Sequence, residues 1–264
     1  MKGINCSWRK NFMYIVGMLN TLVIKGLVVM KGLVLVISIP LFLYGLYVYD
    51  HDEQRVKSDQ QSNHHIGIDI SHYQGNLMDE IKGHDYLDFV ICKATQGITY
   101  TDEDFDKNWR LIKEKGLIRG AYHFFVVSDD PEDQAKHFYD TVPDLGIEDI
   151  APIVDVEELS LSQDTSSRVL QDRLKEFLMV VEEKFGRRPM IYSNYAFAQE
   201  YLKDDWLADY PLWIADYNGK SSPAIPNTWV DVGYKIWQKN NSYHVDSIAT
   251  DFDVFIGQKS DLVR

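Results

Sequence analysis

The chain of 264 residues has the composition of a folded globular protein, with 45% hydrophobic and 25% charged residues. Lysine and arginine number 27 against 40 acidic residues, and the resulting net charge of −13 argues against a protein that binds nucleic acid. The two cysteines, Cys6 and Cys92, are too few for a disulfide framework or a cysteine-rich zinc site. We therefore expect an ordinary apolar core to stabilise the fold.

The first 49 residues are apolar and differ from the rest of the chain. Residues 32–49 carry no charge over 18 positions, which is about the shortest run that crosses a membrane. Lysines and arginines precede this run and acids follow it from Asp50, so the positive-inside rule predicts a cytoplasmic N-terminus. Large aromatic residues stand where a signal peptidase requires small ones, which favours an uncleaved signal anchor over a cleaved signal peptide. A buried core helix is the third interpretation, and Pro40 disfavours it.

The remainder of the chain divides at a polar segment. Residues 50–65 contain a single apolar residue, Val56, and are typical of a solvated stalk. Residues 66–264 are enough for one domain. The sequence thus predicts a cytoplasmic segment at 1–31, a transmembrane anchor at 32–49, a stalk and one domain outside the cell membrane.

Within residues 66–264, short apolar runs alternate with amphipathic stretches. Helical spacing of apolar residues predicts one helix from Phe105 to Gly116 and another from Leu170 to Gly186. Eight strands with intervening helices indicate a parallel α/β barrel of the TIM type, and the sparse helical signal after Tyr217 implies that loops join the last strands. The eight predicted strands are 66–70, 89–93, 118–125, 151–157, 189–193, 212–215, 235–238 and 251–255.

Acidic residues gather at the ends of these strands, and the carboxyl ends of the strands carry the active site in barrels of this type. Asp69 ends the first strand, Asp155 and Glu157 end the fourth, and Asp251 opens the last. Residues two apart on a strand face the same side, so the Cα atoms of Asp155 and Glu157 should lie roughly 6.6 Å apart. Repulsion between two such carboxylates raises the proton affinity of one of them, and a general acid at neutral pH is made in this way.

Each of these acids also has a structural interpretation, because acids at strand ends commonly cap helices or form turns. The pair Asp155 and Glu157 favours function, since burying both acids in a barrel without a use for them is costly. Asp216, which precedes Tyr217, Asn218 and Gly219, is as consistent with a turn as with a binding residue.

A metal site is the competing use of the same acids. Asp69 and Asp155 could share a metal ion with His72 or His123, which lie next to predicted strand ends. No two histidines have the i, i+4 spacing of a zinc-binding helix, and neither a serine nucleophile motif nor a glycine-rich phosphate loop is present in the sequence. We therefore expect a reaction without a cofactor.

Aromatic residues cluster near the same strand ends. Most aromatic residues on strands belong to a core, but beside acids they also offer flat apolar faces and hydroxyl groups to a sugar ring. The combination favours a saccharide substrate. The set consists of Tyr73, Tyr122, Phe124, Tyr192, Trp213, Tyr217 and Trp237.

Eight short motifs in the outer domain resemble, in order, those of family 25 of the glycoside hydrolases, the lysozymes first known from fungi and phages. The similarity spans residues 66–257 and leaves out the apolar segment and the stalk. The motifs are GIDISHYQG (67–75), KATQG (93–97), RGAYHFF (119–125), PIVDVE (152–157), IYSN (191–194), LWIADY (212–217), IWQ (236–238) and DFDVFIG (251–257).

The resemblance implies an irregular barrel of eight strands with fewer than eight helices. It implies cleavage of the β-1,4 bond between N-acetylmuramic acid and N-acetylglucosamine in peptidoglycan. By the same resemblance, Glu157 is the general acid, Asp155 orients the acetamido group of the substrate or stabilises positive charge, and Asp69 and Asp251 complete the acidic set. The positions that resemble groove-lining residues of the family are Tyr122, Tyr192, Trp213, Tyr217 and Gln238.

Three positions depart from the family pattern. Gln96 stands where glutamate is common, Asp253 replaces a frequent asparagine, and His72 precedes the aromatic residue of the first motif. Two other functions stay open at this point, namely a metal-dependent wall hydrolase or deacetylase and an inactive glycan-binding module held at the membrane. We expect the anchor, in place of a wall-binding domain, to keep the protein near its substrate during wall remodelling or in an envelope-spanning assembly.

Overall fold

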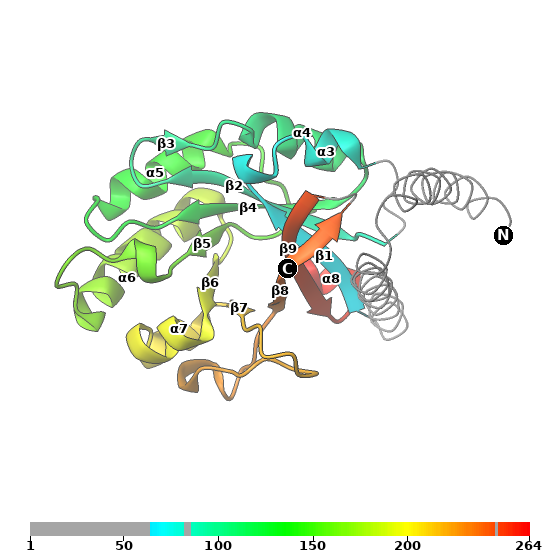
Figure 1. Cartoon of the computed structure of the whole chain (residues 1–264). Coiled ribbons are helices and arrows are strands. Elements are labelled where there is room, and N and C mark those ends of the chain that lie inside the picture. Colours follow the sequence, from blue (N-terminus) through cyan, green and yellow to red (C-terminus); the bar gives the residue numbers. More distant parts are fainter. Residues whose placement is uncertain (1–63, 82–85, 246–247) are drawn as a thin grey trace, which may run out of the picture. The chain divides into compact units, whose positions relative to one another are not determined.

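Apolar strands that alternate with amphipathic helices close into a barrel in the computed structural model, which describes residues 64–81, 86–245 and 248–264 (Figure 1). All eight predicted strands are present. A ninth, β3 (Tyr100–Thr101), extends the sheet beside β2. The strands of the barrel are β1 (His64–Ile70), β2 (Phe89–Gln96), β4 (Ile118–Phe124), β5 (Ile153–Asp155), β6 (Met190–Asn194), β7 (Leu212–Ala215), β8 (Ile236–Val245) and β9 (Ile248–Ile256).

The strands pair around the barrel in the order β1, β2, β4, β5, β6, β7, β8 and β9, and β9 pairs back with β1. Neighbours from β1 to β8 are parallel, but β9 is antiparallel to both β8 and β1. The prediction of a parallel barrel is therefore wrong for the last strand. Only residues 246 and 247 separate β8 from β9, and so short a connection allows an antiparallel pair but no parallel crossover.

Helices lie outside the barrel along β2 to β7 (Figure 1). The predicted helices are confirmed as α4 (Phe105–Glu114) and α6 (Ser167–Phe185), and Gly186 ends α6 in the left-handed conformation with φ 64°. The sequence prediction missed α5 (Pro131–Thr141) and α7 (Tyr195–Tyr201). In α5 the Asp130 side chain accepts hydrogen bonds from the first free N–H groups, and Pro131 occupies a position where no N–H is needed.

Short helical turns complete the described chain. Between β7 and β8 the described residues contain one such turn, η4, which agrees with the expectation of loops between the last strands. The short elements are η1 (His72–Gln74), α3 (Leu77–Glu80), η2 (Glu158–Ser160), η3 (Asp205–Asp209), η4 (Asn227–Trp229) and α8 (Lys259–Leu262).

A cluster of buried apolar side chains from the strands, from Ile150 and from α8 fills the barrel toward the amino ends of its parallel strands. Tyr122 and Tyr192 pack against it. Cys92 is buried as a small residue on β2, and its thiol donates to the carbonyl of Gly120 at 3.5 Å. The members of the cluster are Phe89, Ile91, Ile150, Ile153, Met190, Trp213, Ile236, Phe255 and Leu262.

The barrel begins slightly earlier than the sequence suggested. β1 starts at His64, so His64 and His65, which we assigned to the stalk, are its first residues. The predicted segments 1–31 and 32–49, and residues 50–63 of the stalk, lie outside the described residues. Among the helices that the structure describes, none combines the length and the apolar character needed to span a membrane.

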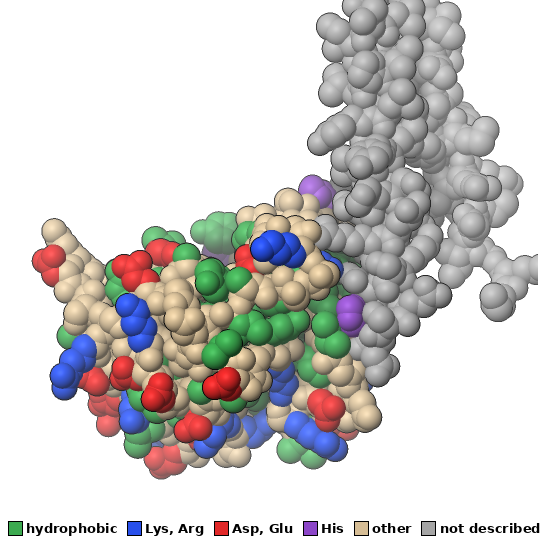
Figure 2. Space-filling view, turned by 90° about the horizontal axis from the view of Figure 1, so that it is seen from below, with side chains coloured by type: hydrophobic (Ala, Val, Ile, Leu, Met, Phe, Trp, Pro, Cys, Tyr) green, Lys and Arg blue, Asp and Glu red, His purple; other side chains and the backbone are tan. Residues whose placement is uncertain are grey.

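Acidic and basic side chains are interspersed on the face of the molecule seen in Figure 2. Neither sign of charge forms a continuous patch on this face, although the whole chain carries a net charge of −13. Mixed charge of this kind is typical of a solvated surface.

Candidate active site

The apolar cluster fixes which side chains point into the barrel. Ile91, Ile153, Met190 and Ile236 belong to the cluster on β2, β5, β6 and β8. Side chains alternate between the two faces of a strand, so the residues two positions further on face the same interior, one layer closer to the carboxyl ends. This upper layer therefore contains Lys93, Asp155, Tyr192 and Gln238.

The antiparallel direction of β9 brings the remaining acids to the same layer. Phe255 belongs to the apolar cluster, and Asp253 and Asp251 precede it by two and four positions. Because β9 runs toward the amino ends of its neighbours, these earlier residues approach the carboxyl ends of the parallel strands. Asp69, near the carboxyl end of β1, lies on the same side as Gly67, which pairs with Asp253.

Asp155 is buried at the end of β5, with 8% of its surface exposed. It stands in register between Phe124 on β4 and Tyr192 on β6. Its Oδ1 atom is buried and has no hydrogen-bond partner among the described residues. Burial raises the pKa of Asp155 well above its ordinary value, the nearby Glu157 raises it further, and the Lys93 ammonium opposes this rise.

Glu157 is partly exposed just beyond β5. Its backbone N–H donates to Ser160 Oγ at 3.1 Å, and the N–H of Ser160 donates to the Glu157 carbonyl at 2.9 Å. These two bonds fix the backbone that carries the side chain. Burial raises the pKa of Glu157, the adjacent Glu158 adds to this, and Lys93 lowers it. A carboxyl group that keeps its proton more tightly than usual, at the mouth of a barrel, has the property that a general acid needs.

Gln238 links Asp69 to two tyrosines. Its Nε2 atom donates to Asp69 Oδ2 at 2.6 Å, and its Oε1 atom accepts from the Tyr192 hydroxyl at 2.9 Å and from the Tyr217 hydroxyl. Burial first, and then Asp253 and Asp251, raise the pKa of Asp69 well above its ordinary value. The predicted residues Asp69, Tyr192, Tyr217 and Gln238 thus belong to one network.

Trp213 and Tyr122 are also in the interior. The Trp213 indole donates to Asp253 Oδ1 at 2.8 Å, and its ring lies 4.5 Å from that of Tyr192. Tyr122 packs against the apolar cluster, and burial and then Asp155 raise its hydroxyl pKa well above the ordinary value. Burial likewise raises the pKa of Asp251, to about 6.

Lys93 was not predicted as a site residue. Its Nζ atom donates to Gln96 Oε1 at 2.7 Å and lies 5.1 Å from the centre of the Phe124 ring. Burial lowers the pKa of Lys93, while Asp155 raises it most strongly among the nearby acids. One signal was available in the sequence. Lys93 is the sole charged residue of an apolar strand, and because it is two positions after Ile91 it faces the same side of that strand.

Two predicted binding residues lie apart from the interior layer. The Asp216 carboxylate accepts from the Ala224 N–H at 2.6 Å and from the side chain of Asn218, which is the turn interpretation of this residue. Tyr73 lies on η1 with 83% of its surface exposed, and its ring is 4.1 Å from that of His72. Tyr73 therefore belongs to the rim after β1.

The two histidines considered as metal ligands have other partners. His72 Nδ1 is 2.7 Å from Asp102 Oδ2. His123 is buried, with Nδ1 2.7 Å from Thr95 Oγ1 and Nε2 3.1 Å from Gln134 Oε1, and its ring stacks on Phe177 of α6 at 4.9 Å. His123 thus faces the helices, while Asp155 faces the barrel interior. Among the described residues, no three His, Cys, Asp or Glu side chains are grouped so that they could hold a metal ion.

Two neighbouring carboxyl groups beside aromatic side chains, at the carboxyl ends of barrel strands, are an arrangement typical of glycoside hydrolases. The chain belongs to glycosyl hydrolases family 25, whose sequence profile matches residues 68–248. The resemblance in the eight motifs is thereby confirmed at the level of the family, and the irregular barrel of eight strands with fewer helices is its fold.

Relatives of known sequence or structure cover most of this chain. The uncharacterized protein YegX of Escherichia coli K12 is 33% identical over 203 residues, which are 74% of this chain and 71% of YegX. The autolytic lysozyme of Clostridium acetobutylicum is 31% identical over 188 residues, 71% of this chain and 54% of that protein. The structure of the muramidase from Trichobolus zukalii superimposes with a TM-score of 0.66 at 31% identity, over 75% of this chain and 97% of that one.

Proposed function

We propose that this protein is a lysozyme that hydrolyses the β-1,4 bond between N-acetylmuramic acid and N-acetylglucosamine in peptidoglycan. One observation carries the proposal, namely that Asp155 and Glu157 stand together at the mouth of a family 25 barrel with Lys93 beside them. Related proteins that bear the names lysozyme and muramidase support this assignment.

The two acids have different environments and suit different roles. Glu157 is partly exposed and has a raised pKa, so it can hold a proton and donate it to the glycosidic oxygen. Asp155 is buried, and its unpaired Oδ1 atom can accept a hydrogen bond from the substrate or lie against positive charge at the anomeric carbon. The Lys93 ammonium favours the anionic form of Asp155, which that second role requires.

The rest of the upper layer suits a sugar ring. Tyr122 and Tyr192 pack on the apolar cluster and offer ring faces above it, while Trp213 belongs to the cluster and supports Tyr192 from below. Gln238 orients the hydroxyl groups of Tyr192 and Tyr217. We assign Asp69 and Asp251 to the negative charge that supports an oxocarbenium-like transition state. Tyr73 and Tyr217, which are exposed, could contact the glycan strand at the rim.

The proposal is tested with purified peptidoglycan and mass analysis of the released fragments. Glu157→Gln should fold normally and lose activity by about 100- to 10,000-fold, the contribution typical of a general acid. Asp155→Asn should also lose activity with its fold intact, as circular dichroism would show. Wild-type turnover by Glu157→Gln would refute its role, and fragments without a new reducing end on muramic acid would refute the reaction.

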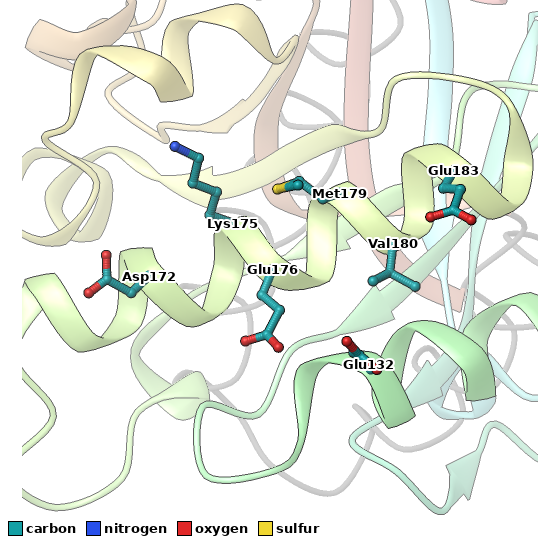
Figure 3. Close-up of a pocket in the computed structure, with 7 residues that line it drawn as sticks. All are labelled: Glu132, Asp172, Lys175, Glu176, Met179, Val180 and Glu183. Carbon is teal, nitrogen blue, oxygen red and sulfur yellow. The ribbon is translucent and has the colours of Figure 1, made fainter.

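Glu176→Gln is a matched control for Glu157→Gln. Glu176 lies on the exposed face of α6, where it extends toward Glu132 of α5 in a surface hollow outside the barrel (Figure 3). The same chemical change there leaves the mouth untouched, so the control should retain the turnover of the wild type.

For the location of the enzyme, our proposal is a single-pass membrane protein, with residues 1–31 in the cytoplasm, 32–49 in the membrane and the barrel outside. The uncharged run of 18 residues and the basic residues before it support this. The full-length chain should sediment with membranes. Protease added to cells whose cell wall and any outer membrane have been removed should digest the barrel domain. A shortened form released into the medium would contradict the anchor.

A further inference from the structure

Asp253 is an acid that the proposed mechanism does not use, and it has 0% of its surface exposed. Its Oδ1 atom accepts a hydrogen bond from the Trp213 indole at 2.8 Å. Its Oδ2 atom is buried and receives no hydrogen bond from any donor of the described chain. A buried anionic oxygen without a donor is strongly unfavourable, whereas the same oxygen with a proton of its own can become a donor.

Asp69 is the group that can share this proton. The side chains of Asp69 and Asp253 are hydrogen-bonded to one another, and both are buried. A hydrogen bond between two carboxyl groups requires one proton, because two carboxylates are both acceptors. The Gln238 amide already donates to Asp69 Oδ2 at 2.6 Å, which fixes the Asp69 side chain from the β8 side.

In the part of the chain that the structure describes, this pair has no cationic neighbour like the Lys93 of Asp155. Asp253 pairs in register with Gly67 on β1 and with Gln238 on β8, and it meets Trp213 from β7. The titratable groups around it are Asp69 on β1, Asp251 on β9 and the Tyr217 hydroxyl after β7. The Asp251 side chain, which is less buried, is hydrogen-bonded to Asp69 as well. None of the described groups that shift the pKa of either carboxyl group is cationic, in contrast to Asp155, which has Lys93.

We propose that Asp69 and Asp253 hold one proton between them and act as a single negative charge, with Asp253 as the positioning residue for Asp69. Burial raises the pKa of both groups well above the ordinary value, in agreement with this geometry. The shared proton joins β1 to β9 at the mouth and aims Asp69 at Gln238. Its meaning for catalysis rests on the proposed function, but its presence does not.

The pair is tested directly by infrared spectroscopy of the full-length chain at pH 7. The wild type should show the carbonyl stretch of a protonated carboxylic acid, and Asp253→Asn should lose part of that band. Asp69→Asn removes the pair from the other side and should lose it too, so the test stands even if one variant does not fold. Asp172→Asn, an exposed acid of α6, is the matched control and should keep the full band. An undiminished band in both pair variants would overturn the proposal.

A second readout is the pH dependence of stability. The folded pair keeps a proton that the separated acids of the unfolded chain release near pH 4. The folding equilibrium constant of Asp253→Asn, divided by that of the wild type, should therefore rise with pH by up to about tenfold per unit above that point. The same ratio for Asp172→Asn should stay flat. A ratio for Asp253→Asn that is flat or falls with pH would also overturn the proposal.

The third readout concerns the reaction. Loss of the shared proton at high pH places two anions in contact, so the alkaline limb of kcat/KM on peptidoglycan should lie at higher pH in Asp253→Asn than in the wild type. An alkaline limb at lower pH would contradict the positioning role. If the wild type failed to cleave peptidoglycan, the proposed function would fail, while the infrared and stability measurements would still decide the shared proton.

Discussion

Gly67→Ala tests how tightly β1 is held in the barrel. A Cβ atom on Gly67 would lie 2.2 Å from Phe89 Cε2 and 2.4 Å from two other ring atoms, whereas carbon atoms pack best at about 3.5–4.0 Å. The strand cannot withdraw, because Gly67 pairs with Phe89 on β2 and with Asp253 on β9. The ring cannot withdraw easily either, since it belongs to the apolar cluster. We expect a loss of about 1–3 kcal/mol in the free energy of unfolding, the cost typical of overpacking a core.

Thermal and urea unfolding of the outer domain measure this loss, and each kcal/mol should lower Tm by about 2–4 °C. Gly146→Ala is the control, because its Cβ would meet only Asp149 Oδ2 at an ordinary 3.6 Å. Adding Phe89→Leu removes the ring, so the double variant should be more stable than the sum of the single changes by about 0.5–3 kcal/mol. Additive changes, or a Gly67→Ala variant as stable as the wild type, would show that the packing argument is wrong.

Three further predictions use the charged residues. Lys93→Met removes the cation that lowers the pKa of Asp155 and Glu157, so the whole pH profile of kcat/KM should move to higher pH. Arg119→Met breaks a buried pair with Asp149 and should cost about 3–5 kcal/mol in urea unfolding, against about 0–1 kcal/mol for Arg110→Met at an exposed pair. Asp251 has its pKa raised from 3.8 to about 6, so the folded chain keeps a proton that the unfolded chain releases. The free energy of unfolding of the wild type should therefore fall as the pH rises from 3.8 to about 6, and that of Asp251→Asn should fall less, as urea unfolding at several pH values would show.

The pattern of apolar residues was sufficient for the strands but not for their directions. Alternation identifies a strand such as 251–255 without saying which way it runs. The direction of β9 follows from the hairpin that it forms with β8. The sequence did not reveal this hairpin, because the apolar run that predicted β8 ends at Gln238, whereas β8 continues to Val245. The reversed direction also explains why Asp251 lies near the other acids. The first residues of the antiparallel β9, and not its last, lie at the carboxyl ends of the parallel strands.

For the site, the sequence predicted the acids better than their partners. The acids Asp69, Asp155 and Glu157 follow from strand ends and from the family motifs, and the structure brings them to one mouth. Lys93 stands out in the sequence as the one charged residue of β2, but its role could not be assigned because its partner Asp155 lies on β5, far away in the sequence. Asp216 was ambiguous because the sequence does not show whether a carboxylate meets a ligand or the N–H group of Ala224.

The pairing of β9 with β1 joins the first strand of the barrel to the last. A nascent chain that ends before residue 248 cannot close this ring, and it leaves both β1 and β8 with an open edge. Contacts between such distant parts of a sequence form slowly, because a long loop must be closed first. The domain should therefore complete its folding only after synthesis of the whole chain, and a prematurely terminated product should aggregate through its exposed strands.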